Sequence, residues 1–185
     1  VSAVHLTHLT IDTTFYLAVR QLHLFIPSCA NLTSLCFSGE LDDPPLIQFL
    51  EMCPAIENLD LGDVYGISDE SALAVAHLPH LKSLSVVNCA FSDVLLNELA
   101  EQGHRLEYLN IKHCYYGITN SGLSNLLQNC RSLYTLEINF SQLTELQAPY
   151  LGNLTTLKVS LAYGNRVKTF LQDIAPHASK LEHIQ

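Results

Sequence analysis

A six-residue pattern of apolar residues returns along almost the whole chain at a nearly constant distance. The pattern is apolar-x-x-apolar-x-apolar, where x is mostly polar, and its copies begin at Leu6, Leu32, Ile56, Leu81, Leu106, Leu133, Leu154 and Leu181. These residues lie 26, 24, 25, 25, 27, 21 and 27 positions apart, and the eighth copy is incomplete. Repetition at a period of about 20 to 50 residues is the signature of architectures that stack one small unit.

Each copy of the pattern predicts a short strand, and a helix is predicted in most of the intervals. Alternation places the apolar residues on one face of the strand and the x residues on the other. Farther along, apolar residues follow helical spacing at 72–76, 94–100 and 123–127. Residues typical of helix starts precede these stretches and one earlier stretch, namely Ser68, Ser92, Thr119, and Asp42 with Pro44.

One strand and one helix cannot cover their own apolar faces, whereas stacked repeats bury these faces against one another. Parallel strands also need a crossover connection, which the helix supplies. The sequence therefore predicts an α/β fold: one solenoid domain of about seven repeats over residues 1–185, curved, with a parallel sheet on its concave face and helices on its convex face.

Two segments depart from the regular repeat, and both ends lack polar capping units. We expect a helix over 13–25, and a short helical turn or 3₁₀ segment over 141–149, where the repeat is short and contains Pro149. Because solenoid ends need caps, we expect the chain to be part of a longer protein.

Acidic residues are concentrated in one part of the chain, whose net charge is −9. Residues 40–101 hold twelve acids (Glu40, Asp42, Asp43, Glu51, Glu57, Asp60, Asp63, Asp69, Glu70, Asp93, Glu98 and Glu101) against one base, Lys82. An acidic surface repels phosphate backbones, so we expect a protein partner with a basic patch and no nucleic acid. The alternative is a solvated surface that only aids solubility. No apolar run approaches the ~20 residues of a membrane span, so no membrane partner is expected.

Cysteines recur at fixed places in the repeat. Its fullest copy runs over 106–114 and 118–126, and a cysteine precedes three other copies, as Cys29, Cys53 and Cys130. This pattern resembles the cysteine-containing class of leucine-rich repeats, over essentially the whole chain. The class is found in F-box leucine-rich-repeat proteins.

The resemblance implies a non-catalytic function in protein recognition. In F-box leucine-rich-repeat proteins the solenoid is the substrate receptor of a Skp–cullin–F-box ubiquitin ligase, and a separate F-box binds the adaptor. No F-box is recognisable in these 185 residues. We expect a protein of the cytoplasm or the nucleus.

The repeat pattern also explains where most of the cysteines occur. Five of the six (Cys29, Cys53, Cys89, Cys114 and Cys130) occupy repeat positions where a small apolar group is buried at a turn. Cys36 falls on an exposed strand position. Reduced thiols suit an intracellular protein, and a disulfide network is the alternative.

The x residues of the strands are the candidate binding surface. Tyrosine is favoured at binding hot spots, and we expect partner contacts at Asn58, Asp60, Tyr108, Asn110, Lys112 and Glu137. Loops after two strands add candidate rim residues, Tyr65, Tyr115 and Tyr116. Alternatively, small polar residues only keep a wide sheet soluble, and the tyrosines pack on neighbouring loops.

Catalytic, metal and cofactor sites are not expected. The sequence has no Gly-x-Ser-x-Gly motif and no Gly-rich phosphate loop. The closest histidine pairs, at 5 and 8 and at 77 and 80, have no cysteine or carboxylate at ligand spacing. Related proteins that bind anionic cofactors use basic clusters, whereas the strand positions here offer only Lys112 and Lys158.

Three functional hypotheses follow. The first is the substrate-recognition solenoid of a ubiquitin ligase. The second is a structural or assembly subunit held in a larger complex. The third is an extracellular recognition domain, which requires glycans at the sequons of Asn31, Asn139 and Asn153. Chance occurrence is the simpler explanation of those sequons.

Overall fold

The computed structural model describes residues 6–13, 29–102, 105–114, 117–139, 148–160, 172 and 174–184. Within them, nine strands form one parallel sheet, and eight of these strands follow the chain order across it. Those eight are β1 (His8–Thr13), β2 (Ser34–Glu40), β3 (Asn58–Asp60), β5 (Ser83–Ser85), β6 (Tyr108–Asn110), β7 (Thr135–Asn139), β8 (Thr156–Ser160) and β9 (His183–Ile184). The short β4 (Val64–Tyr65) pairs with β2 beside this path.

The leucines of successive repeats are in register. Leu59 pairs with Leu84, Leu84 with Leu109, and Leu109 with Leu136. All four are fully buried, so they form a continuous apolar stack between the sheet and the helices. This register confirms the predicted leucine-rich-repeat solenoid, in which each repeat buries its apolar side against its neighbours.

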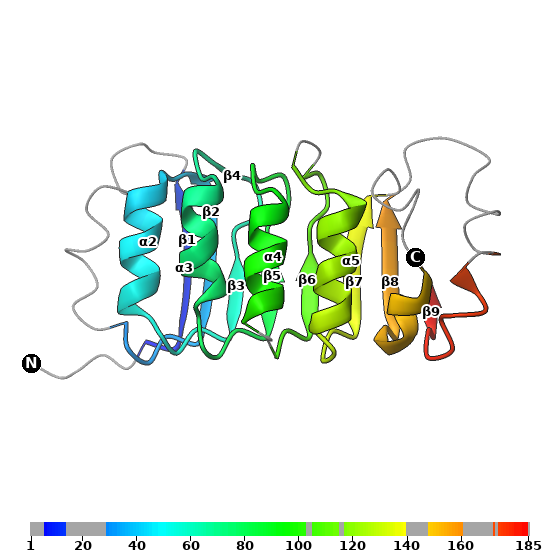
Figure 1. Ribbon diagram of the computed structural model, residues 1–185. Helices are drawn as coiled ribbons and strands as arrows, with labels where there is room; N and C mark the ends of the chain where they lie inside the picture. Colours follow the sequence, from blue (N-terminus) through cyan, green and yellow to red (C-terminus); the bar gives the residue numbers. More distant parts are fainter. Residues whose placement is uncertain are drawn as a thin grey trace, which may run out of the picture.

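The helices lie on one face of the sheet (Figure 1). They are α2 (Asp43–Met52), the 3₁₀ helix η2 (Asp69–Ser71) with α3 (Ala72–Ala76), α4 (Asp93–Glu101) and α5 (Asn120–Asn129), and the 3₁₀ helix η4 (Ala148–Asn153) occupies the corresponding interval of the short repeat. The predicted 3₁₀ segment is thus confirmed in its described part. The helix expected over 13–25 lies outside the described residues, apart from Thr13, which ends β1.

A ladder of aspartates joins the starts of consecutive helices. The first helical residue of one repeat accepts two hydrogen bonds, from the backbone N–H and the hydroxyl of the residue that caps the next helix. The pairs are Asp43 with Ser68 (2.9 and 2.8 Å), Asp69 with Ser92 (2.8 and 2.5 Å) and Asp93 with Thr119 (2.8 and 2.6 Å). The three capping hydroxyls also accept an N–H from their own helices, as N-caps do.

The buried end of the ladder is held ionised. Burial alone would raise the pKa of Asp43, but hydrogen bonds from Ser71 and Ser68 outweigh it and lower that pKa below its usual value. Gly122, near the start of α5, lies against this ladder. A Cβ atom at Gly122 would collide with the Asp93 carboxylate, so glycine lets α5 approach the ladder closely.

Replacing Asp93 with alanine is expected to lower the free energy of unfolding by about 1–3 kcal/mol, since both Thr119 donors lose their acceptor. Asp93→Asn keeps one acceptor oxygen and should be intermediate. Glu98→Ala, on the same helix, is the matched control, with an expected change below about 0.5 kcal/mol. Urea unfolding measures all three, and equal stability of the Asp93→Ala and Glu98→Ala variants would show that the ladder does not stabilise the fold.

Five cysteines are buried at their repeat positions, as predicted. The Cys89 thiol donates to the Leu61 carbonyl and the Cys114 thiol to the Val86 carbonyl, each at 3.0 Å, so the thiols satisfy carbonyls of the preceding repeat. Burial is the main cause that raises the pKa of Cys89 to about 12. Cys36 is half-buried on the sheet rather than fully exposed, and none of the six cysteines is in a disulfide, which does not support a disulfide network.

Candidate functional site

The candidate site is the free face of the sheet, which is the side opposite the helices. Strand register places the x residues in rows across it, as predicted. The first row is His8, Ser34, Asn58, Ser83, Tyr108, Thr135, Thr156 and His183, and the second is Thr10, Cys36, Asp60, Ser85, Asn110, Glu137 and Lys158. None of the described helices covers this face (Figure 1).

The part of the free face over β1 to β5 is polar and lies open. Asn58 and Asp60 on β3 are exposed, and the serines of β5 are half-buried. Asp60 also shapes the end of its strand, since its Oδ1 accepts the N–H of Gly62 at 2.9 Å. Such a bond to the second residue on is typical of aspartate at turns. Asp60 is therefore both a local turn former and an exposed carboxylate.

The part over β6 to β8 carries a tight cluster, which we call the Glu137 cluster: Tyr108, Lys112, Glu137 and Lys158. Glu137 is its centre and its side chain is only 6% exposed. Its Oε1 accepts from the Tyr108 hydroxyl at 3.0 Å and lies 2.8 Å from Lys158 Nζ, while its Oε2 lies 2.6 Å from Lys112 Nζ. Side chains from β6, from the turn after β6 and from β8 thus converge on one carboxylate of β7.

The charges of the cluster follow from this geometry. Burial alone would raise the pKa of Glu137, but hydrogen bonds from Lys112, Lys158 and Tyr108 lower it below its usual value. Burial, followed by the hydrogen bond to Glu137, raises the pKa of Tyr108 to about 12. At neutral pH, therefore, two ammonium groups surround one carboxylate, and the cluster carries one net positive charge. The cluster therefore presents ammonium N–H donors whose positions are fixed by ion pairs with Glu137.

The repeats match a known family along most of their length. Residues 40–184 match the family model described as FBD-associated F-box protein At5g56370, LRR repeats. The chain belongs to this family of leucine-rich repeats. Leucine-rich repeats bind proteins, and their fold is generally non-catalytic.

A solved structure agrees on the fold. The leucine-rich-repeat chain is similar to an internalin from Listeria monocytogenes str. 4b F2365, with a TM-score of 0.53 and 20% sequence identity. The match covers 84% of this chain and 42% of the internalin, so the chain spans less than half of that protein's length. At this identity the likeness shows the leucine-rich-repeat fold alone.

The six predicted contact residues fall into two groups in the leucine-rich-repeat domain. Asn58 and Asp60 are exposed on β3, as a contact surface requires. Tyr108, Lys112 and Glu137 lie together in the Glu137 cluster. Asn110 and Glu137 are buried, and Asn110 Oδ1 accepts the N–H of Lys112 at 3.2 Å. These two residues support the face more than they extend from it.

Sequence reasoning placed Lys158 on the free face but missed its role. A signal was available, because Glu137 and Lys158 occupy the same position in consecutive repeats and pair directly across β7 and β8. Opposite charges at matching positions of parallel strands predict such an ion pair. The interval between these two repeats is shorter than the others, but this does not change the register of β7 and β8.

The rim of the free face is only partly described. Tyr65 in β4 is exposed there, as predicted, whereas Tyr115 and Tyr116 lie outside the described residues. The turns after the strands repeat a left-handed conformation, with φ of 59° at Asp63, 58° at Asn88 and 66° at His113. Aspartate, asparagine and histidine tolerate this region better than most residues, which is a sequence signal that the repeat pattern alone did not reveal.

Other candidate sites receive little support from the described residues. Among them, no group of three or more His, Cys, Asp or Glu side chains is arranged to hold a metal ion. Their helices also include none that is long and apolar enough to cross a bilayer. Asn139, the second sequon residue, is buried, so a glycan there would require the β7 strand to rearrange.

Proposed function

We propose that this leucine-rich-repeat domain is the substrate-binding part of a Skp–cullin–F-box ubiquitin ligase that acts in the cytoplasm or nucleus. The supporting observation is the match of residues 40–184 to the repeats of an F-box protein. The sheet face opposite the helices gives such a domain a place to hold a protein, since Asn58, Asp60 and other polar residues over β1 to β5 are exposed or half-buried there. The adaptor would bind through an F-box elsewhere in the protein.

The free face has opposite charges at its two ends, which would orient a substrate. Asp12 and Asp60 are exposed near the β1 end. The Glu137 cluster, with one net positive charge, lies over β6 to β8. Complementary charges steer encounters and fix orientation more than they raise affinity. The preferred substrate would therefore place a basic patch over β1 to β3 and acceptor groups over the Glu137 cluster.

Co-purification of the tagged natural protein, with all sequence that flanks these repeats, tests the ligase assignment. We expect a Skp-type adaptor and a cullin to co-purify in stoichiometric amounts. A full-length protein that binds neither would contradict the assignment, whatever its repeats bind.

Charge reversal on the free face tests the substrate surface separately. In the full-length protein, Asn58→Arg combined with Asp60→Arg should weaken substrate binding about tenfold, as expected for 1.4 kcal/mol, while adaptor binding stays unchanged. Glu101→Arg, at the exposed end of α4, is the matched control and should change neither. Substrate binding that is equally strong in both variants would remove the free face from the proposal.

A further inference from the structure

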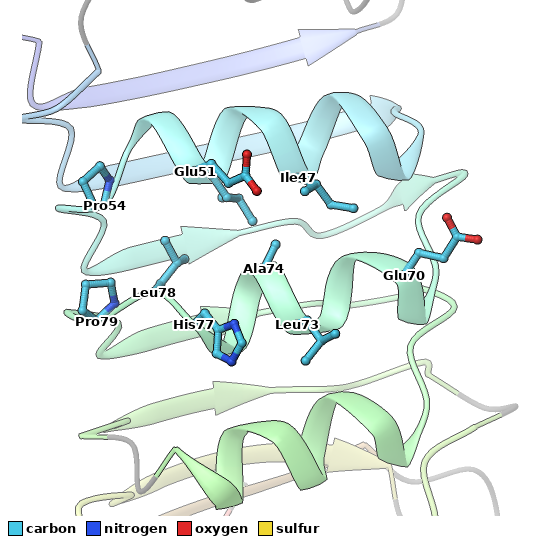
Figure 2. A pocket seen from close by; sticks show the side chains of 10 residues that line it. Ile47, Glu51, Pro54, Glu70, Leu73, Ala74, His77, Leu78 and Pro79 are labelled. Atoms are coloured by element: carbon cyan, nitrogen blue, oxygen red, sulfur yellow. The ribbon is translucent and has the colours of Figure 1, made fainter.

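The helix side of the solenoid contains a groove between α2 and α3, far from the Glu137 cluster in the sequence. Its volume is about 430 Å³. Figure 2 shows α2 and α3 side by side, with Pro54 and Pro79 at one end of the groove and Glu70 at the other. The lining is mostly apolar: Ile47 and Leu50 come from α2, and Leu73, Ala74 and Leu78 come from α3 and the residues after it.

The groove exists because α3 is short and built from small residues. It has 5 residues, against 10 in α2 and 9 in α4, and its sequence is Ala-Leu-Ala-Val-Ala. Ala74 leaves space where a longer side chain would reach α2. The result is an apolar opening, at which the Leu73 residue is 47% exposed.

The helices α4 and α5, by contrast, are joined by polar side chains. Asn125 Nδ2 donates to Asn97 Oδ1 at 2.8 Å. Between α2 and α3 the hydrogen bonds in the described residues lie at the helix starts, where Asp43 contacts Ser68 and Ser71. Beyond that point the helices are separated by the apolar groove.

The charge around the groove is acidic. Glu51 from α2 and Glu70 from η2 belong to its lining, which contains no lysine or arginine. The surrounding part of the chain, residues 40–101, has Lys82 as its single lysine or arginine. Lys82 is paired with Glu57 at 2.8 Å. A ligand in the groove would therefore meet an apolar floor with two carboxylates and the imidazole of His77, and no lysine or arginine.

We propose that this groove binds a short protein segment in which leucine-like side chains are flanked by lysine or arginine. The ten lining residues are fewer than the roughly 20–30 per side of a standard protein interface, which favours a short segment over a folded domain. The volume lies at the lower end of the range of about 300–1,000 Å³ that is usual for ligand pockets. This second surface is independent of the proposed function on the free face.

Labelled synthetic peptides test the groove in the full 185-residue chain. The probe is a leucine pair flanked by lysines, with two matched peptides, one with glutamates for the lysines and one with serines for the leucines. Fluorescence polarisation should show saturable binding of the first peptide, and binding of either matched peptide at least about tenfold weaker. Equal binding of the serine peptide would overturn the proposal, because only general charge attraction would remain.

Variants locate the binding. Ala74→Phe should fill the groove, and Glu51→Lys with Glu70→Lys should reverse its charge, and each should weaken the lysine–leucine peptide about tenfold. The matched controls are Val94→Phe, at an exposed apolar residue of α4, and Glu98→Lys with Glu101→Lys, and both should keep wild-type affinity. Thermal unfolding confirms that each variant is folded.

Two further results would overturn the proposal. The first is loss of binding in the control variants to the same extent as in the groove variants. The second is a groove occupied by another copy of the chain, seen as concentration-dependent self-association that Ala74→Phe abolishes. The free-face variant Asn58→Arg with Asp60→Arg should bind the peptide normally. The proposal for the groove and the proposal for the free face can therefore be contradicted independently of each other.

Discussion

Replacing Leu109 with alanine should lower the free energy of unfolding by about 3 kcal/mol. Leu109 is fully buried on β6, in register with Leu84 on one side and Leu136 on the other. The cavity would open in a central repeat, and each repeat of a solenoid is stabilised by its two neighbours. For a chain of this size the melting temperature should fall by about 6–12 °C, which thermal unfolding measures.

Leu73→Ala is the matched control for Leu109→Ala. It removes the same atoms from a leucine that is 47% exposed on α3. Its expected cost is below about 1 kcal/mol, because little apolar surface returns to water. Similar losses in the two variants would mean that the leucines of the repeat pattern do not form the core.

Replacing Glu137 with alanine should lower the free energy of unfolding by about 2 kcal/mol. The change leaves two ammonium groups close together without their carboxylate, and leaves the Tyr108 hydroxyl without its acceptor. Removing one partner of a fully buried pair costs about 3–5 kcal/mol, and the smaller value here reflects lysines whose side chains are 25% and 38% exposed. Glu57→Ala breaks the exposed pair with Lys82 and should have little effect.

Acid should remove this contribution of Glu137. Its partners lower the pKa of Glu137 in the folded chain, so the stabilisation is complete above the usual glutamate pKa of about 4.3. It is lost as the pH falls through the lower pKa of the folded state. Urea unfolding at neutral pH and in acid should therefore show a difference between wild type and Glu137→Ala that shrinks with acidification. A difference independent of pH would contradict the ion-pair explanation.

The sequence was sufficient to predict the repeated fold. Leucine spacing specifies which residues face the core, and the strand period of two then determines the register of every row on the free face. Helix starts were also predictable, because Ser68, Ser92 and Thr119 are good N-cap residues and each caps its helix in the structure.

Interactions between repeats were harder to predict from the sequence. Asp43, Asp69 and Asp93 each hold the cap of the following helix, which the sequence of a single repeat does not show. The burial of Glu137 depends on long side chains from neighbouring repeats, so no single repeat predicts it. The α2–α3 groove likewise results from a difference in length between two helices.

The claim that the free face holds the partner can be tested by site-specific photo-crosslinking of the full-length protein in cells. A photoreactive residue would replace Ser83, on β5 at the centre of the free face, or Gln128, exposed on α5 on the helix side. We expect the bound protein partner to be trapped at position 83 and not at position 128. A partner trapped only at position 128 would contradict binding on the free face.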